Sequence, residues 1–236
     1  MINKLTENVY YTRPDEATDR PVMGYVRGKK FSLMVEAGNS AKTVESYSRA
    51  LSHMGLPRPD FAVVTHHHWD HCFGIDALSA VSIALKETND ILLEMSRWKW
   101  SAEDLEQYVT EDKIPLFCRP HIIEEYKDVS LIKVKPADIA FKDEMVLELG
   151  EQKCIFKRIT SPHTDDSAIV YIPNEKTVFF GDCLCEELVR DQWIDNKEKL
   201  AILTAELEKL DFDWGLEGHF DPKPKSLIIE ELKARL

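Results

Sequence analysis

The sequence predicts an α/β (α+β) fold, in which strands and helices alternate along a chain of 236 residues. The apolar run at 61–64 has the continuous hydrophobic character of a strand that other elements cover on both faces. Near the C-terminus, leucines recur at 200, 203, 207 and 210, which is the spacing of a helix with one buried face. The 44% hydrophobic and 31% charged fractions are typical of a folded globular protein. We therefore expect a single domain over residues 1–236 with a sizeable core.

The first part of the chain contains β-branched and aromatic runs separated by turn residues. We expect its strands at residues 9–12, 22–27, 31–35, 61–65 and 81–85. Gly28, Lys29 and Lys30 predict a hairpin turn between the second and third of these strands. Asn39 or Ser40 can cap a helix that runs to about residue 54, because apolar residues follow at helical spacing. A short helix is expected to begin at 76–78.

The stretch from 86 to 126 differs from the rest, and we interpret it as a helical insertion or lid. Helices are expected at 91–95 and 104–109, and Trp98 and Trp100 between them should pack the insertion onto the body. Further strands are expected at 129–134, 145–149, 154–159, 168–172 and 177–180. A turn at 173–176 and helices at 196–210 and 226–236 complete the prediction.

Charge and cysteine content narrow the classes of partner and location. The net charge of −12 disfavours a surface that neutralises phosphates, so a nucleic-acid partner is not expected. The N-terminus lacks a signal-peptide apolar region, and no apolar run reaches the length of a membrane span. The five cysteines lack the spacing of a secreted disulfide framework, and Cys183 and Cys185 are better explained as buried thiols than as a redox pair. We expect a cytoplasmic protein without a membrane partner.

The segment from Thr65 to His71 concentrates imidazole and carboxylate groups directly after the strand at 61–64. His66 and His68 are two residues apart, so on an extended segment both point to the same side while His67 points away. Asp70 and His71 fall where the chain should turn into a helix, and they can reach a second ion nearby. Because imidazole and carboxylate bind borderline divalent ions such as zinc, the segment predicts a metal site at a strand end.

Three further candidates, His163, Asp182 and His219, each follow an apolar segment downstream. A dinuclear hydrolytic site needs a group that bridges its ions, and a carboxylate at a rigid strand end suits that role. Asp182 follows such a strand, and Gly181 before it lets the backbone approach its neighbours closely. We expect all the candidates to converge on one edge of the sheets.

The order His66-x-His68-x-Asp70-His71, then His163, Asp182 and His219, resembles the metallo-β-lactamase-fold hydrolase superfamily over nearly the whole chain. The resemblance implies a four-layer αββα sandwich of two mixed sheets with the metals at one edge. It also implies that His66, His68 and His163 hold the first ion and that Asp70, His71 and His219 hold the second. Asp182 would bridge the two.

This resemblance implies a hydrolase whose two divalent ions generate a hydroxide that attacks an electrophilic carbonyl or phosphorus, with Asp70 orienting the nucleophile. Zinc is the expected metal, although histidine and carboxylate ligands do not distinguish it from iron or manganese. The expected substrate is a small ester, thioester or lactone. Phosphodiester cleavage at the same centre is one alternative, and an iron-binding sensor or oxygen-chemistry protein is another. The oligomeric state is not indicated.

Some positions depart from the family pattern. Aspartate rather than cysteine at 182 makes the chain resemble the glyoxalase II, lactonase and ribonuclease Z branches, and on a strand Cys183 would point away from the metals. The Asp-Thr-Gly usual after the early strand is Glu36-Ala37-Gly38 here. Asp165 and Asp166 are expected to add negative charge near the mouth of the site, which disfavours phosphodiesters and glutathione thioesters.

Other residues are candidates for substrate contact or for structure. His121 and Trp98, both in the insertion, are the substrate-contact candidates. His53 and His67 are expected to be structural or exposed. Three more side chains can line a pocket but stay outside the predicted site, because nothing in the sequence positions them: Arg190, Trp193 and Tyr126.

Overall fold

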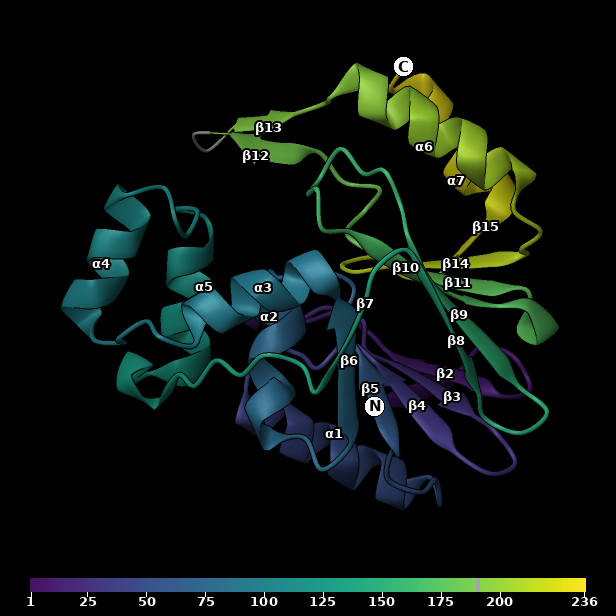
Figure 1. The fold of residues 1–236 in the computed structure, drawn as a ribbon, viewed down its shortest axis with the longest axis horizontal. Helices are drawn as coiled ribbons and strands as arrows, with labels where there is room; N and C mark the ends of the chain where they lie inside the picture. The colour runs from purple at the N-terminus through teal and green to yellow at the C-terminus, as the bar shows by residue number, and fades with distance from the viewer. Residues whose placement is uncertain (190–191) are drawn as a thin grey trace.

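The computed structural model describes residues 1–189 and 192–236, which form two β-sheets packed face to face with helices on both outer sides. In Figure 1, α1 lies against the sheet that contains β4 to β6, and α6 and α7 lie against the sheet that contains β9 to β11. This arrangement is the expected αββα sandwich, so the predicted fold class is confirmed.

The first sheet has seven strands in the order β1 to β7, with antiparallel pairing from β1 to β4 and parallel pairing from β4 to β7. Its strands are β1 (Ile2–Lys4), β2 (Val9–Thr12), β3 (Gly24–Arg27), β4 (Ser32–Val35), β5 (Phe61–Val63), β6 (Val81–Leu85) and β7 (Ile139–Phe141). Because β5 pairs in parallel with both of its neighbours, its C-terminal end opens at the same edge of the sheet as theirs. The histidine segment begins at that edge.

The second sheet has six strands in the order β15-β14-β11-β10-β9-β8. They are β8 (Glu144–Glu148), β9 (Lys153–Arg158), β10 (Ala168–Ile172), β11 (Thr177–Gly181), β14 (Trp214–Glu217) and β15 (Lys223–Pro224). A separate hairpin consists of β12 (Glu187–Val189) and β13 (Gln192–Ile194). Since β11 and β14 are parallel, the residues that follow them, Asp182 and His219, leave the sheet at the same end.

The helices cover the outer faces of the sheets and form a lobe beside them (Figure 1). They are α1 (Ala41–His53), α2 (Trp69–Cys72), α3 (Lys86–Met95), α4 (Ala102–Thr110), α5 (Cys118–Tyr126), α6 (Lys197–Lys209) and α7 (Lys225–Ala234). Ser40 caps α1 and Asn196 caps α6, each accepting a hydrogen bond from a main-chain N–H of the first turn. No described helix has the length and apolar character needed to cross a membrane.

The core between the sheets is aliphatic and aromatic. Val35, Val63 and Ile83 from the first sheet pack with Phe156 and Phe179 from the second, and all are almost inaccessible to solvent. A separate apolar cluster joins α2 to α5, and in it Trp100 contacts Phe73 with ring centroids 5.6 Å apart. This rigid frame holds the strand ends at one edge in fixed positions.

Several local features differ from the predictions, including strands β1, β7, β14 and β15, for which no strand was expected. Residues 129–134 do not form a strand, because the Asp128 side chain accepts hydrogen bonds from the N–H and O–H of Ser130 and stabilises a 3-10 turn at Val129–Leu131. The short helical turn expected to begin at 76–78 instead spans Phe73–Ala77 and ends there. Helix α5 was not expected, since Pro120 is a helix breaker except in the first turn, where it lies here.

Candidate metal centre

The histidine segment follows β5, bends at Thr65 and His66, and turns into α2 at His68. His68 has the extended backbone angles of a residue that precedes a helix, with φ −60° and ψ 144°. Asp70 and His71 then lie within the four-residue α2 and are buried. The segment therefore presents side chains from a bend and from a helical turn to the same region, although the expected extended conformation is interrupted at Thr65 and His66.

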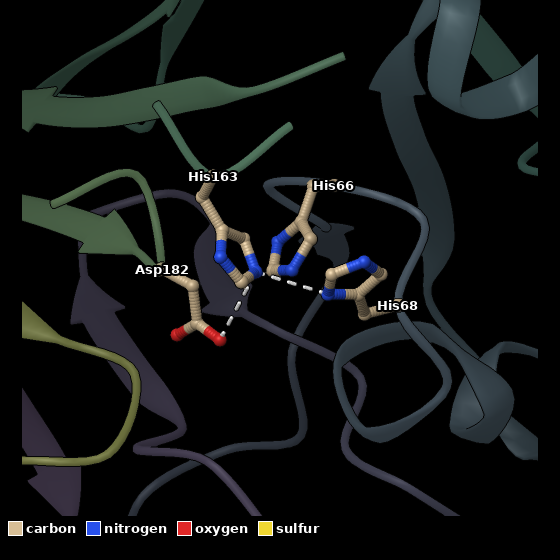
Figure 2. Close-up of side chains that lie close together, drawn as sticks. All are labelled: His66, His68, His163 and Asp182. Atoms are coloured by element: carbon tan, nitrogen blue, oxygen red, sulfur yellow. Dashed lines mark hydrogen bonds and ion pairs between the residues drawn. The ribbon is translucent and has the colours of Figure 1, made fainter. Parts of the chain in front are cut away.

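The first group of side chains consists of His66, His68, His163 and Asp182, which Figure 2 shows converging from three loops. Their potential ligand atoms all lie within 4.8 Å of one another. His163 Nε2 lies 3.0 Å from His68 Nδ1 and 3.7 Å from Asp182 Oδ2. Three imidazoles and one carboxylate at this separation form a donor set that suits a tetrahedral divalent ion.

The second group consists of Asp70, His71, Asp182 and His219, again with all potential ligand atoms within 4.8 Å. Asp182 Oδ2 lies 3.3 Å from Nε2 of both His71 and His219. Asp70 Oδ2 lies 3.0 Å from His71 Nε2 and 3.3 Å from His219 Nε2. The structure thus brings together all seven side chains that the sequence selected, and Asp182 belongs to both groups.

Several of these atoms are buried without a hydrogen-bond partner among the described residues. They include His66 Nε2 in the first group and Asp182 Oδ1, which belongs to the residue that both groups share. A buried polar atom without a partner costs about 1–3 kcal/mol, so such a concentration of them at one point requires compensation. A cation in each group would supply that compensation, and the residues present therefore fit a metal centre.

Burial and charge give the two groups different protonation states. Burial, together with neighbouring histidines, lowers the pKa of His66 and of His68 well below 6.5, so both rings are neutral and ready to donate a lone pair. Burial alone would also lower the pKa of His71 and His219. The carboxylates of Asp70 and Asp182 outweigh burial there and raise the pKa of both histidines well above 6.5.

Glu36 contacts the second group through His71. Its Oε1 lies 3.2 Å from His71 Nδ1, and its two oxygens accept hydrogen bonds from the Thr65 hydroxyl and main-chain N–H at 2.6 and 3.2 Å. Glu36 has φ 66°, a left-handed conformation that is unusual for a residue other than glycine. The carboxylate thereby orients His71 and ties it to the start of the histidine segment.

Gly181 allows this arrangement, as expected from the sequence. Its φ is 53°, and a Cβ at this position would lie 2.1 Å from Thr65 Oγ1. The backbone between β11 and Asp182 can therefore turn toward Thr65 only without a side chain. This close approach of Gly181 to Thr65 places Asp182 beside the ligand atoms of both groups.

His67 and Asp166 form a structural pair away from the two groups. The carboxylate of Asp166 accepts hydrogen bonds from the His67 main-chain N–H at 3.0 Å and from the Thr88 hydroxyl at 2.9 Å, and it lies 2.9 Å from His67 Nδ1. The prediction that Asp165 and Asp166 charge the mouth of the site was wrong, because Asp166 is buried in these contacts and Asp165 pairs with Lys199 at 2.7 Å. His67 points away from the metal groups, as predicted.

The centre lies at the floor of a cavity of about 710 Å³. Its apolar wall includes Phe117 from the start of α5 and Trp193 from β13, whose ring centroids lie 5.9 Å apart. The carboxylates that line it outside the metal groups belong to Glu16, Asp19 and Glu186. The lining residues that the structure describes include no lysine or arginine, so the mouth is acidic, although not through the residues expected.

The candidates for substrate contact lie in different places. His121 lines the cavity, whereas Trp98 lines a neighbouring hollow and stacks on Tyr108 at 4.5 Å. Trp193 lines the cavity, and the Tyr126 hydroxyl donates to Asn39 O instead. Arg190 lies outside the described residues. Cys183 is buried in the core beside α6, and Cys185 reaches the cavity wall, with burial raising the pKa of both thiols.

Residue patterns did not single out several supporting side chains. Glu36 had one available signal, since it stands where the family usually has aspartate. Asp19 lines the cavity with Oδ1 3.7 Å from His219 Nδ1, and burial followed by the charge of Asp70 raises its pKa to about 7. No local signal marks Asp19, because its neighbourhood depends on the distant His219 segment.

Comparisons with known proteins agree with this geometry. The family model of the metallo-beta-lactamase superfamily matches residues 19–222. An acyl-coenzyme A thioesterase, MBLAC2 of Gallus gallus, is 24% identical over 222 residues, covering 87% of this chain and 74% of that protein. A metallo-beta-lactamase from Pontibacter korlensis superposes with a TM-score of 0.68 at 16% identity, covering 99% of this chain and 97% of that one.

A metallo-beta-lactamase family protein from Thermus thermophilus superposes with a TM-score of 0.65 at 19% identity, covering 98% of this chain and 80% of that one. At these identities the structural matches establish the fold, and the family model covers most of the chain. The chain therefore belongs to the metallo-beta-lactamase superfamily and is a hydrolase of that family.

Proposed function

We propose that this hydrolase uses a dinuclear metal centre to cleave a small ester, thioester or lactone. The observation that carries the proposal is the pair of ligand groups that share Asp182 at the floor of a 710 Å³ cavity. The similarity to a protein named as an acyl-coenzyme A thioesterase supports an acyl substrate and places thioesters first among the bonds to test. Zinc is the proposed metal, because three of the four side chains in the first group are imidazoles, which zinc binds in tetrahedral sites.

One ion would be held by His66, His68 and His163. The other would be held by Asp70, His71 and His219, and Asp182 would be a ligand of both. When bound, the ions supply an activated water and polarise the attacked carbonyl. Asp70 lines the cavity, and we assign it the orientation of the attacking water through its carboxylate. In the net reaction water adds to the acyl carbon, the C–O or C–S bond breaks, and the proton leaves with the departing alcohol or thiol.

The charge of the cavity separates acyl substrates from phosphodiesters. Glu16, Asp19 and Glu186 line it, and its described lining includes no lysine or arginine to bind a phosphate. A substrate that is uncharged near the scissile bond meets no such repulsion. We therefore place phosphodiester cleavage second, and we keep a cytoplasmic location as a proposal that the five free thiols support.

The test combines metal analysis of the purified protein with a panel of thioesters, esters, lactones and phosphodiesters. We expect about two zinc ions per chain and oxygen-independent turnover of at least one acyl substrate. His66→Ala and Asp182→Ala should each lose metal and lower turnover by two orders of magnitude or more, on the order of the loss typical for a catalytic group.

His53→Ala is the matched control, since His53 is exposed at the end of α1. It should retain the metal content and turnover of the wild type. Stoichiometric iron with oxygen-dependent chemistry would instead favour the sensor or oxygen-chemistry alternative. Turnover confined to phosphodiesters would reject the acyl assignment, and unchanged metal content in both ligand variants would reject the centre itself.

A further inference from the structure

A second hollow of about 300 Å³ lies beside the main cavity, and both are lined by His68, Pro115 and Cys118. His68 belongs to the first metal group, so the second hollow also borders the centre. Hydrolysis divides a substrate into two parts at the reacting carbon. Two spaces that both border the reacting centre can each receive one of these parts.

The second hollow is mainly apolar. Ile91 and Met95 from α3, Trp98 after it and Ile114 before α5 contribute aliphatic and aromatic surface. The carboxylates of Glu16, Asp19 and Glu186 line only the main cavity. Three charged residues, Glu94, Asp112 and Lys113, also line the second hollow, but all three are exposed to solvent, whereas Met95 and Ile114 are buried. An aliphatic chain can therefore leave water against these buried apolar residues.

The walls of this hollow are already in place. The Trp98 ring lies 4.5 Å from Tyr108 and 6.0 Å from Trp100, centroid to centroid, and the Tyr108 hydroxyl donates to Lys99 O at 2.9 Å. Lys113 lies at the rim, where its charge is paired with Glu111 at 2.7 Å. A pocket that is built before the ligand arrives loses little entropy on binding.

We propose that this second hollow binds the aliphatic acyl chain of the substrate, leaving the alcohol or thiol part to the acidic main cavity. The inference rests on the proposed acyl hydrolase function and extends it to a substrate class: esters or thioesters of an aliphatic acid with an uncharged or cationic leaving group. It also gives the segment at 86–126 a role, because α3 and the turn before α5 form most of the acyl pocket.

The test compares acetyl and octanoyl esters and thioesters of one uncharged alcohol or thiol on the zinc-loaded enzyme. The ratio of kcat/KM for octanoyl over acetyl should exceed one in the wild type. Ile91→Phe fills the hollow from a partly exposed position and should lower that ratio about tenfold or more, since each excluded methylene is worth roughly fourfold. Trp98→Ala widens the hollow and should shift the preferred chain to a longer one.

Ile202→Phe is the matched control, because Ile202 is an exposed residue of α6 and lines neither space. Its octanoyl to acetyl ratio should equal that of the wild type. If the octanoyl to acetyl ratio is unchanged in Ile91→Phe but falls in Trp193→Ala, the proposal is overturned and the acyl chain binds in the main cavity. The acyl pocket would also be overturned if the enzyme cleaves acyl substrates but neither Ile91→Phe nor Trp98→Ala changes this ratio. That result would leave the hydrolase function intact.

Binding of the product acids gives a readout that does not depend on turnover. Calorimetry should show octanoate binding the zinc-loaded wild type more tightly than acetate, and Ile91→Phe should remove most of that difference. Equal affinities for the two acids would refute the acyl pocket. If no ester or thioester is cleaved but octanoate binds preferentially and Ile91→Phe abolishes the preference, the proposed reaction fails while the apolar pocket stands.

Discussion

Gly218 provides a way to disturb the shared carboxylate without removing any proposed ligand. A Cβ at this position would lie 1.9 Å from Asp182 Oδ1 and 3.0 Å from His71 Cε1. The backbone cannot easily move aside, because the Gly218 N–H donates to Gly181 O at 2.8 Å and its carbonyl accepts from Val22 N at 2.6 Å. The φ of Gly218 is outside the left-handed region, so Gly218→Ala adds a steric conflict without backbone strain.

The size of the effect follows from that conflict. Adding a methyl group to a packed site costs about 1–3 kcal/mol. Because the backbone is held by hydrogen bonds, we expect the conflict to be relieved by a displacement of the Asp182 side chain, and a displaced carboxylate no longer meets both groups of ligands. The cost therefore falls mainly on the loaded state, where it corresponds to a rise in the zinc Kd of about 5- to 150-fold.

Chelator competition measures the zinc affinity, and thermal unfolding measures stability, in Gly218→Ala and in the matched control Gly215→Ala. A Cβ at Gly215 would lie 2.3 Å from Ile228 Cδ1 and 2.5 Å from Phe180 Cε2, so the same substitution three residues earlier overpacks the core instead. The control should lose stability but keep its zinc affinity. Wild-type zinc affinity in Gly218→Ala would refute the role assigned to the position of Asp182.

Three further predictions concern protonation and support of the centre. Zinc binding at neutral pH should release about two protons, because the carboxylates hold the pKa of His71 and His219 well above 6.5. Calorimetry in buffers of different ionisation enthalpy counts the released protons. Binding heats that do not depend on the buffer would contradict this prediction. Asp166→Ala should lower the free energy of unfolding by roughly 1–3 kcal/mol for each buried donor left unpaired, as measured with urea, and an unchanged midpoint would argue against the structural role. In the ion-free protein, burial raises the pKa of Asp19 from 3.8 to about 7, so the free energy of unfolding should fall as the pH rises through that interval. Asp19→Asn should lessen this fall. An identical pH dependence of stability in both proteins would show that the pKa of the carboxyl is not raised.

The histidine segment could be predicted from sequence because its geometry is local. His66 and His68 follow β5 within a few residues, and the turn into α2 directs Asp70 and His71 toward the same region. His163, Asp182 and His219 could be added because each follows an apolar segment, and β9, β11 and β14 run in the same direction, which places their ends at one edge. Their mutual distances required the structure.

The surroundings of the centre could not be predicted, because they depend on contacts between distant segments. Asp166 resembles a surface aspartate in sequence, yet Thr88 and the backbone of His67 bury it. Likewise Phe117 and Trp193 are 76 positions apart in the sequence and meet only when α5 and the β12–β13 hairpin close the cavity wall. Residue spacing carries no information about such meetings.

The ligands, which could be predicted, and the cavity walls, which could not, belong to different parts of the molecule. The metal groups stand on α2 and on the segments that follow strands β5, β9, β11 and β14, whose positions are fixed by the core between the sheets. The walls of the cavity and of the acyl pocket come mainly from the segment at 86–126 and the β12–β13 hairpin, which contribute no residue to either metal group. Substitutions in the walls can therefore change which substrate is held while the strand ends continue to position the ligands, and the choice of substrate is separable from the chemistry.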